Sequence, residues 1–391
     1  MIQSGVSNSP QHELADVFNR YWDRYLKNHK ASSRVHKIVN AIRNCRTAEL
    51  GYHKIKCSNP GCDHEEISYN SCRDRHCPKC QGSKQIEWVN NRLKELLPVP
   101  YFHGIFTIPH LLNKLMLFNQ RLIYDLFFEA TSYALNLFAR DEKFLGGQLG
   151  FFGILHTWGQ NLCYHVHIHY IIAGCGLLKF HERVKRLPYQ EKFLFPVKAM
   201  SKTIREYFIK RLKEAYYNGK LYLGGELGVL AEIDQFERFC DVLGSQAWYC
   251  YAKPPFAGPD KVVEYIGRYT HRVALSNNRI KNIDDNGIDF SYKDYKDESK
   301  IKEMHLKTDT FIQRMLYHFL PYGFRKIRHF GFLSGSNHNR NFEMLKSFFE
   351  DAVDAELCKS IKNWFERFRG CLDRICPVCK TGTLIFQYSY G

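Results

Sequence analysis

The chain begins with a helical pattern of apolar residues. Between residues 11 and 44, apolar side chains recur three or four positions apart, which predicts helix. They are Leu14, Val17, Phe18, Tyr21, Trp22 and Tyr25, followed by Val35, Ile38, Val39 and Ile42. Residues 45–82 lose this period and are rich in cysteine and histidine, so we expect irregular structure held by metal. Residues 86–97 again predict a helix, which ends at Pro98.

After this segment, short apolar runs alternate with long helical ones. The run from Tyr101 to Ile108 is apolar and aromatic and ends at Pro109, as is typical of a strand. Further strands are predicted at 149–157, 164–173 and 248–252 and, shorter, around Ile280 and at 288–292. Helices are predicted at 110–140, 197–217, 262–272, 308–320 and from about 345 onward. Strands in hairpin-like pairs between long helices predict an α+β fold, with an antiparallel sheet flanked by helices.

Composition narrows the class of protein. The chain has 391 residues, 45% of them hydrophobic, with 24 Tyr and 29 Phe, which argues against a disordered chain. Its formal net charge of +16 indicates a polyanionic partner, of which nucleic acid is the usual one. Met1 to Glu13 lacks the apolar core of a secretory signal, and no apolar run is long enough to span a bilayer. We therefore expect a soluble, cytoplasmic protein with no membrane partner.

A cysteine-rich module follows the first helical segment. Six of the 14 cysteines fall between Cys45 and Cys80, interspersed with histidines. In a cytoplasmic protein this density indicates structural zinc, which takes four sulfur or nitrogen ligands. The spacing predicts one site from Cys57, Cys62, Cys77 and Cys80, and a second from Cys45, His53, Cys72 and His76. His64 could compete as a ligand, and His53 and His76 could instead be hydrogen-bonded surface histidines.

Two smaller features accompany this module. The basic side chains in the same segment could bind DNA phosphates, or could form a solvated basic surface; they are Arg73, Arg75, Lys79 and Lys84. Far downstream, Cys376-Pro377-Val378-Cys379 resembles half of a zinc ribbon. Only Cys358 and Cys371 lie near it in sequence, so the ligand set of this candidate third zinc is incomplete.

Three histidines alternate in the strand predicted at 164–173. In Tyr164-His165-Val166-His167-Ile168-His169, the three imidazoles share one face of the strand and the apolar residues share the other. Neutral imidazole is a common metal ligand. His156, in the preceding strand, could supply a third ligand from across the sheet, and Gln160 is the alternative. Three protein ligands leave positions open for substrate, as in a catalytic site. The alternative for each of these histidines is that it is a hydrogen-bonded residue of the core and binds no metal.

A pair of tyrosines provides candidate nucleophiles. Tyr265 and Tyr269 are four residues apart and share one face of the predicted helix 262–272. Such a pair usually packs in a core, but Arg268, His271 and Arg272 beside it suit DNA phosphates better than a core. A tyrosine hydroxyl can attack phosphorus when it is activated, for instance by a nearby cation.

Together these motifs resemble the two-tyrosine HUH transposases of bacterial insertion sequences that move by a rolling-circle route. His167-Ile168-His169 matches the His-hydrophobic-His motif. His165-Val166-His167 also fits that motif, but we favour His167-Ile168-His169 because the longer apolar strand follows it. Tyr265 and Tyr269 match the paired nucleophiles. Residues 70–81 resemble the family's zinc-binding domain, and 155–160 and 323–329 are also similar to it, so the resemblance covers roughly residues 35–335.

The resemblance implies a mechanism and a domain plan. One tyrosine attacks single-stranded DNA at a transposon end and becomes linked to the 5′ phosphate, and the second can hold another strand, such as the target. The family's catalytic ion is Mg²⁺ or Mn²⁺, although imidazoles would equally accept Zn²⁺ or Ni²⁺. The resemblance also implies one or two structural Zn²⁺ and no nucleotide cofactor. It leaves open whether the chain associates with copies of itself. The expected domains are a helical leader (1–44), a zinc-binding domain (45–97), an HUH catalytic domain (98–345) and a C-terminal helix with a partial zinc ribbon (346–391).

Two other functions fit the same residues. A replication-initiation or plasmid-mobilisation nuclease would use the same HUH chemistry on a different DNA partner. A non-catalytic, zinc-dependent DNA-binding regulator would leave the histidines without metal and the two tyrosines packed in a core. The zinc module favours the transposase.

Overall fold

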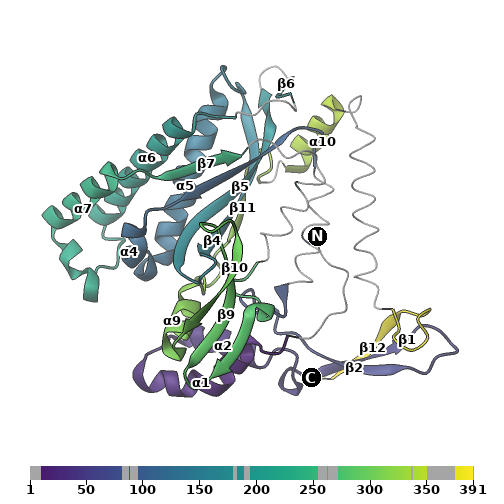
Figure 1. Cartoon of the computed structure of the whole chain (residues 1–391). Coiled ribbons are helices and arrows are strands. Elements are labelled where there is room, and N and C mark those ends of the chain that lie inside the picture. Colours follow the sequence, from purple (N-terminus) through teal and green to yellow (C-terminus); the bar gives the residue numbers. More distant parts are fainter. Residues whose placement is uncertain are drawn as a thin grey trace.

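The computed structural model describes residues 10–81, 88, 96–178, 183–188, 194–253, 262, 272–335, 338–349 and 375–390. In these residues three sheets are accompanied by helices (Figure 1), and all the strand pairs are antiparallel. The predicted α+β fold is therefore confirmed. Within the described ranges, no helix is both long and apolar enough to cross a membrane.

The central sheet carries the histidine strand. Its strands run in the order β11-β4-β5-β3-β7, and β6 pairs with β5. They are β3 (Tyr101–Thr107), β4 (Gln148–Trp158), β5 (Tyr164–Leu178), β6 (Arg183–Arg186), β7 (Tyr249–Lys253) and β11 (Ile327–Gly331). β3, β4, β5 and β7 coincide with predicted strands, whereas β6 and β11 were not predicted. β11 is five residues long and has only two large apolar side chains, Ile327 and Phe330, so its sequence carries little apolar signal.

Both faces of the central sheet are buried at one end. Alternate residues of β4 divide between two cores: Phe151 and Leu155 join the large core under the helices, and Phe152 and Ile154 join a second core on the opposite face. This explains why β4 and β5 are apolar at consecutive positions, since a strand covered on both sides has no solvent face. The helices that cover the first face are α4 (Asn113–Phe118), α5 (Gln120–Arg140), α6 (Val197–Tyr217) and α7 (Ile233–Ser245), with 3-10 turns η2 (His110–Leu112) and η3 (Gly225–Ala231).

The helix predicted over 110–140 is interrupted at Asn119. The side chain of Asn119 accepts a hydrogen bond from Tyr222 N (2.7 Å) and donates one to Tyr222 O (3.0 Å). Its backbone leaves the helical region, with φ −128° and ψ 36°, so α4 and α5 are separate helices. A side chain that bonds a distant backbone segment competes with helix continuity, and the apolar period alone cannot show this. α6, by contrast, has the bounds that the sequence predicted.

The N-terminal helices belong to a second body of the fold. α1 (Leu14–Asn28) and α2 (Ser33–Arg43) replace the single helical stretch predicted over 11–44, because Ser32 caps α2 by accepting a bond from Val35 N (3.3 Å). Their apolar faces share one core with segments far along the chain. These are β8 (Ile280–Asp284), β9 (Gly287–Asp294), β10 (Lys300–Leu306) and α9 (Thr308–Tyr317), with the 3-10 turn η4 (Asn277–Arg279).

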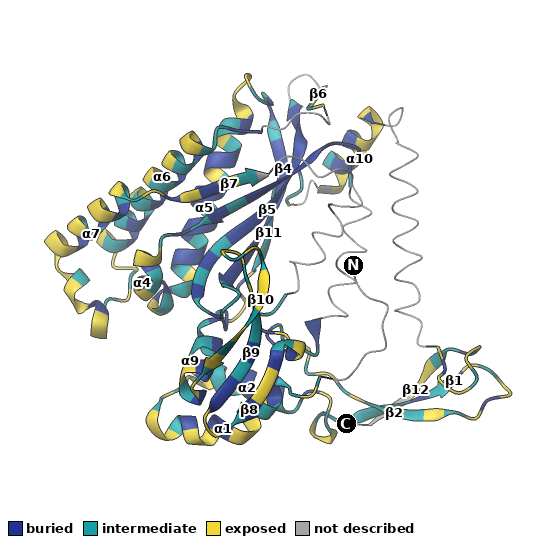
Figure 2. Cartoon of the chain, in the orientation of Figure 1, coloured by how far each residue is buried: buried dark blue, intermediate teal, exposed yellow. Residues whose placement is uncertain are grey.

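A third, thin sheet joins a hairpin in the N-terminal part of the chain to its last described strand. Its order is β12-β1-β2, with β1 (Tyr52–Cys57), β2 (Glu65–Tyr69) and β12 (Leu384–Tyr390), preceded by the 3-10 turn η1 (Ala48–Leu50). Figure 1 shows β12 in yellow beside β1 in purple. The expectation of irregular structure throughout 45–82 was therefore wrong, since that segment contains a β-hairpin. Figure 2 shows that most of this sheet is exposed or half-buried, unlike the central sheet.

Two predicted segments cannot be compared in full. The helices predicted at 86–97 and 262–272 lie outside the described residues, apart from Trp88, Leu96, Leu97, Val262 and Arg272. The helical tail predicted from about 345 is described only as α10 (His338–Phe348), which begins seven residues earlier.

Candidate functional site

Three histidines meet on one face of the central sheet. His156 on β4 lies directly opposite His167 on β5, and His169 is two residues along the same face. The ligand nitrogens of these three residues lie within 4.8 Å of one another, and their ring centroids are 4.8 to 5.4 Å apart. The structure thus brings together the ligand set favoured from the sequence, which we call the histidine cluster.

The alternation of the strands fixes the side on which the histidine cluster lies. Val166 and Ile168 point into the large core under α5 and α6. The imidazoles therefore point to the opposite face, the one on which Ile171 joins the second core. A cavity of about 740 Å³ opens at this end of that face.

Two imidazoles of the histidine cluster, those of His167 and His169, are in the form that binds metal. Burial, assisted by the neighbouring His165, lowers the pKa of His167 to about 4. Burial and the surrounding histidines also hold the pKa of His169 well below its ordinary value. Both rings are therefore neutral at pH 7. His167 Nδ1 lies 2.9 Å from the carbonyl of His165 and donates to it, which leaves Nε2 free to face the cavity.

A fourth histidine, His103 on β3, supports the cluster from behind. Its Nε2 lies 3.0 Å from Nδ1 of His169, and the two rings are stacked with centroids 5.2 Å apart. His103 is almost completely buried. Such a contact fixes the tautomer and ring orientation of a metal ligand. Sequence reasoning missed His103, although it occupies the same face as Thr107 in the strand that pairs with the histidine strand.

The wall of the cavity is rich in aromatic and polar side chains. Tyr249 and Tyr251 on β7 share the face of the histidine cluster, with ring centroids 6.4 Å apart. Tyr249 is 60% exposed and Tyr295, which also lines the cavity, is 63% exposed. Other lining residues include Thr107, His110, Trp158, Gln160, His165 and Arg272.

The two alternative ligands predicted from the sequence lie at the edge of this arrangement. His165 is paired with His110 at the rim, with 3.4 Å between Nδ1 and Nε2, rather than grouped with the other histidines. Gln160 lines the cavity, and its backbone carbonyl accepts a bond from Arg279. The geometry thus favours His167 and His169 as the His-hydrophobic-His pair, with His156 on β4 as the third ligand.

The predicted nucleophiles are not placed by the structure. Tyr265 and Tyr269 lie outside the described residues, as do Arg268 and His271. Arg272, at the end of the same predicted helix, is described and lines the cavity of the histidine cluster.

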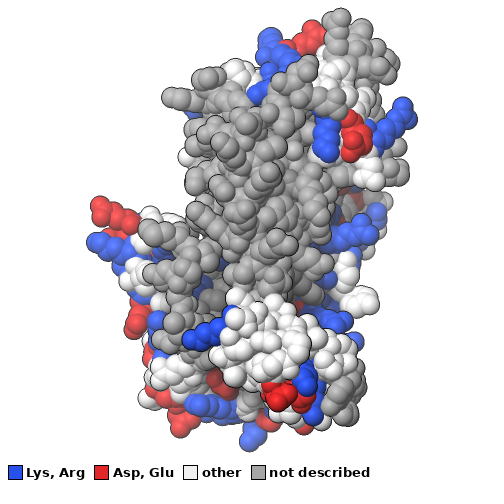
Figure 3. Space-filling model, turned by 90° about the vertical axis from the view of Figure 1, so that its right-hand side faces the viewer, with Lys and Arg blue, Asp and Glu red and all other residues white. Residues whose placement is uncertain are grey.

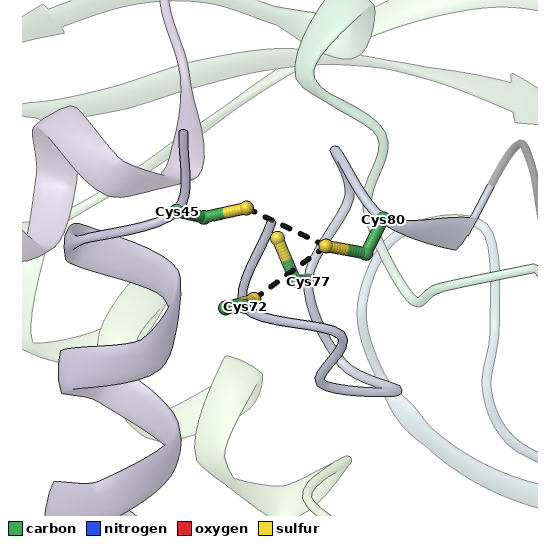
Figure 4. Close-up of side chains that lie close together, drawn as sticks. All are labelled: Cys45, Cys72, Cys77 and Cys80. Atoms are coloured by element: carbon green, nitrogen blue, oxygen red, sulfur yellow. Dashed lines mark hydrogen bonds between the residues drawn. The ribbon is translucent and has the colours of Figure 1, made fainter. Parts of the chain in front are cut away.

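Four cysteines form a second candidate metal site. The sulfur atoms of Cys45, Cys72, Cys77 and Cys80, the first cysteine cluster, point toward a common centre (Figure 4). Cys80 Sγ lies 3.4 Å from Cys45 Sγ and 3.6 Å from Cys72 Sγ. Four sulfurs bound tetrahedrally at about 2.3 Å from zinc would be about 3.8 Å apart, so the cluster fits zinc. Hydrogen bonds from Cys72 and Cys77 lower the pKa of Cys45 to about 7, toward the thiolate that binds metal.

The remaining cysteines correct the grouping predicted from spacing. Cys57 and Cys62 do not join Cys77 and Cys80; their partners are Cys376 and Cys379, which form the second cysteine cluster with them. The reason is topological: β12 returns to pair with β1 and brings the distant pair alongside. Spacing identifies the local pairs but not which pairs meet. Cys358 and Cys371 lie outside the described residues.

The histidines predicted as zinc ligands have other partners. His53 Nδ1 lies 3.2 Å from the Asn70 side-chain oxygen. His76 is buried; its Nδ1 lies 2.8 Å from a carboxylate oxygen of Asp74, and its Nε2 accepts a bond from Leu320 N (3.0 Å). Both ring nitrogens of His76 are thus used, so it ties the cysteine module to the segment after α9. His64 lies 3.7 Å from the Glu66 carboxylate.

The basic residues of the module are only partly available to DNA. Arg75 donates to the Phe324 carbonyl, and Lys79 pairs with Glu13 at 2.5 Å. Arg73 is exposed. On the face shown in Figure 3, the described basic side chains are interspersed with acidic ones. The net positive charge therefore does not gather into one basic patch among the described residues of that face.

Comparison with known proteins identifies the class. A family described as "Putative transposase" matches residues 150–341, and one described as "Transposase zinc-binding domain" matches residues 17–108. The first includes the histidine cluster, and the second includes the first cysteine cluster. The chain is therefore a DNA-processing enzyme of the transposase class with a zinc-binding domain.

Two relatives define the family more closely. "Putative transposase y4qJ" of Sinorhizobium fredii is 39% identical over 378 residues, which is 95% of this chain and 94% of that protein. "Transposase for insertion sequence element IS801" of Pseudomonas savastanoi is 26% identical, covering 85% of this chain and 79% of the relative. The chain belongs to this family of insertion-sequence transposases, which confirms the resemblance found in the sequence. No solved structure matches the chain.

Proposed function

We propose that this transposase nicks and rejoins single-stranded DNA through a covalent 5′-phosphotyrosine, with Tyr265 and Tyr269 as the nucleophiles. The observation that carries the proposal is the histidine cluster: three imidazoles, two of them held neutral by burial, converge on an open cavity. The sheet already has an apolar core on each face. Clustered imidazoles with lowered pKa values beside a cavity fit the ligands of a catalytic ion better than a further core.

The histidine cluster would hold the divalent ion. Three protein ligands leave coordination positions open toward the cavity. When bound, Mg²⁺ or Mn²⁺ polarises a phosphate oxygen and offsets the charge that develops in the transition state. His167 is oriented by the His165 carbonyl and His169 by His103, so the ligand nitrogens are preorganised.

One of the proposed nucleophiles, Tyr269, is tied to the cavity by connectivity. Arg272 lines the cavity. Tyr269 precedes it by three residues, so the Cα atoms of the two residues are at most about 11 Å apart. Arg272 is also positioned to meet a phosphate oxygen beside the histidines.

The chemistry requires no nucleotide cofactor. The oxygen of one tyrosine attacks phosphorus, and the bond from phosphorus to the 3′ oxygen breaks. The tyrosine proton passes to solvent, and the released 3′ oxygen takes up a proton. Rejoining reverses these steps with a different 3′ hydroxyl, and the second tyrosine allows two strands to be held at once.

The exposed tyrosines of the cavity wall favour a single-stranded substrate. Tyr249, Tyr251 and Tyr295 are exposed and line the cavity of the histidines. Unpaired bases can stack on such rings, whereas bases inside a duplex cannot. A replication or mobilisation nuclease would share this site, but the names of both relatives favour transposition.

The test is adduct formation with single-stranded oligonucleotides and Mn²⁺, followed on a denaturing gel. We expect a covalent protein–DNA band that the Tyr265→Phe/Tyr269→Phe double variant loses by at least ~100-fold. Tyr295→Phe removes a hydroxyl from the same cavity and is the matched control, which should retain the band. Absence of any band with oligonucleotides from the element's ends would overturn the assignment and favour a non-catalytic DNA-binding protein. Loss of the band in the Tyr295→Phe control alone would instead assign the nucleophile to Tyr295.

A further inference from the structure

We propose that the second cysteine cluster is a zinc site built from both ends of the described chain, which holds β12 to the zinc-binding domain. The matched zinc-binding family ends at residue 108, so two of the four ligands lie outside it. Cys57 is the last residue of β1 and Cys62 lies in the loop after it, whereas Cys376 and Cys379 come from the turn before β12.

The sulfur geometry fits a tetrahedral ion. All four ligand atoms lie within 4.8 Å of one another. Cys57 Sγ is 3.6 Å from Cys379 Sγ, and Cys62 Sγ is 3.8 Å from Cys376 Sγ. These separations are close to the ~3.8 Å expected around zinc and far from the ~2.05 Å of a disulfide. The partners in each pair belong to opposite ends of the chain, so the ion would be shared between them.

In each cysteine pair, one sulfur accepts a backbone N–H from a residue two or three positions further along the chain. Asn59 N lies 3.4 Å from Cys57 Sγ, and Gly382 N lies 3.3 Å from Cys379 Sγ. Amide donors around a thiolate stabilise its charge and orient it for metal. Both turns therefore supply an amide donor to a sulfur, although four residues separate the cysteines of the first pair and two separate those of the second.

The two turns also contact each other directly. Ser58 N donates to Thr383 O (2.8 Å), and Thr383 N donates to Ser58 Oγ (2.9 Å). Gly382 packs so closely that a Cβ there would lie 2.4 Å from Cys57 Sγ. Only glycine allows the second turn to approach the first ligand at this distance.

The sheet around the second cysteine cluster has too small a core to account for this close docking. The core there consists of the cysteines and little else, with Leu384 packed against it. Ile67 is 53% exposed and Phe386 is 61% exposed. A module this thin needs a metal to fold stably. Because Cys62 and Cys376 are 314 residues apart, a shared ion would close a very long loop and remove much freedom from the unfolded chain.

The first experiment is thiol footprinting of the unaltered protein with N-ethylmaleimide and peptide mass spectrometry. We expect Cys57, Cys62, Cys376 and Cys379 to be protected together, and to become reactive together when a strong chelator is added. Cys175 and Cys240 are buried in apolar cores and away from the clusters; they control for burial, because their protection should not respond to the chelator. If Cys376 and Cys379 react freely while Cys57 and Cys62 stay protected, the proposal fails.

The second experiment counts zinc. Cys376→Ser/Cys379→Ser and Cys57→Ser/Cys62→Ser should each lower zinc content by one ion per chain, and the quadruple variant should also lose only one. Cys163→Ser, a half-buried cysteine outside the clusters, is the control and should lose none. A loss of two ions in the quadruple variant would mean that the two pairs bind separate ions, and would overturn the shared site. Footprinting of Cys45 and Cys72 in the same variants shows whether the first cysteine cluster stays intact.

Discussion

The histidine cluster and the second cysteine cluster join their residues in opposite ways. His156, His167 and His169 stand on neighbouring strands of a sheet that has an apolar core on each face. Cys57 and Cys62 meet Cys376 and Cys379 in a thin sheet with almost no core. In the first case the fold positions the ligands, and in the second the ligands help to hold the fold. Removal of metal from the histidine cluster should therefore abolish activity, and removal of metal from the second cysteine cluster should unfold the sheet around it.

The largest effect is expected from breaking the histidine cluster. His167→Ala should reduce covalent adduct formation by at least ~100-fold, because one of three ligands to the catalytic ion is lost. The sheet should keep its fold, with a melting temperature within about 5 °C of the parent's. A gel assay and a thermal melt check the two parts. His165→Ala is the matched control, since His165 faces the rim; if both variants lose activity equally, the 167/169 register is wrong.

The next effect separates the two regions by hydrogen exchange. After zinc removal with a chelator, amides of β1, β2 and β12 should lose protection by ~100-fold or more, because metal binding supplies their folding energy. Amides of β4 and β5 should change little, since two apolar cores hold them. An equal loss of amide protection in both sheets would show that metal supports the two sheets to the same extent.

A smaller effect is expected behind the histidine cluster. His103→Ala removes the partner of His169 Nδ1 and should weaken Mn²⁺ binding by about 10–100-fold, as loss of such partners typically does. His103→Gln can still accept the bond from His169 and should recover part of the affinity. The measurement is a Mn²⁺ titration followed by electron paramagnetic resonance. If alanine and glutamine variants bind Mn²⁺ like the parent, His103 has no positioning role.

The smallest effect concerns substrate binding at the cavity wall. Tyr249→Ala should weaken single-stranded DNA binding by about 1–3 kcal/mol, the usual contribution of one stacked base. Tyr249→Phe keeps the ring face and should bind as the parent does. Fluorescence anisotropy with a labelled oligonucleotide gives both values. A matching loss in the phenylalanine variant would assign the contribution to the hydroxyl instead of stacking.

The sequence predicted the central elements well because they carry strong periodic patterns. α6 and the strands β3, β4 and β5 appear where the apolar period placed them. Alternation along β5 put the histidines on one face, and the short connection from β4 brought His156 across from His167. These are local consequences of strand geometry, so they need no knowledge of the tertiary fold.

The sequence could not show what distant segments do for one another. The partners of Cys57 and Cys62 depend on β12, whose pairing with β1 leaves no trace in the spacing of the cysteines. The break at Asn119 depends on Tyr222, and the hydrogen bond from Leu320 to His76 depends on the end of α9. His103 gave no motif of its own, because its role arises only from the neighbouring strand.

The central claim is that Tyr265 or Tyr269 attacks DNA beside the histidine cluster. The most direct test is to trap the adduct with a single-stranded oligonucleotide and Mn²⁺, digest it with protease and nuclease, and map the modified peptide by mass spectrometry. We expect a 5′-linked nucleotide on Tyr265 or Tyr269, and none when His167 is replaced by alanine. A nucleotide on Tyr249, Tyr251 or Tyr295, or an adduct that survives the loss of His167, would contradict the claim.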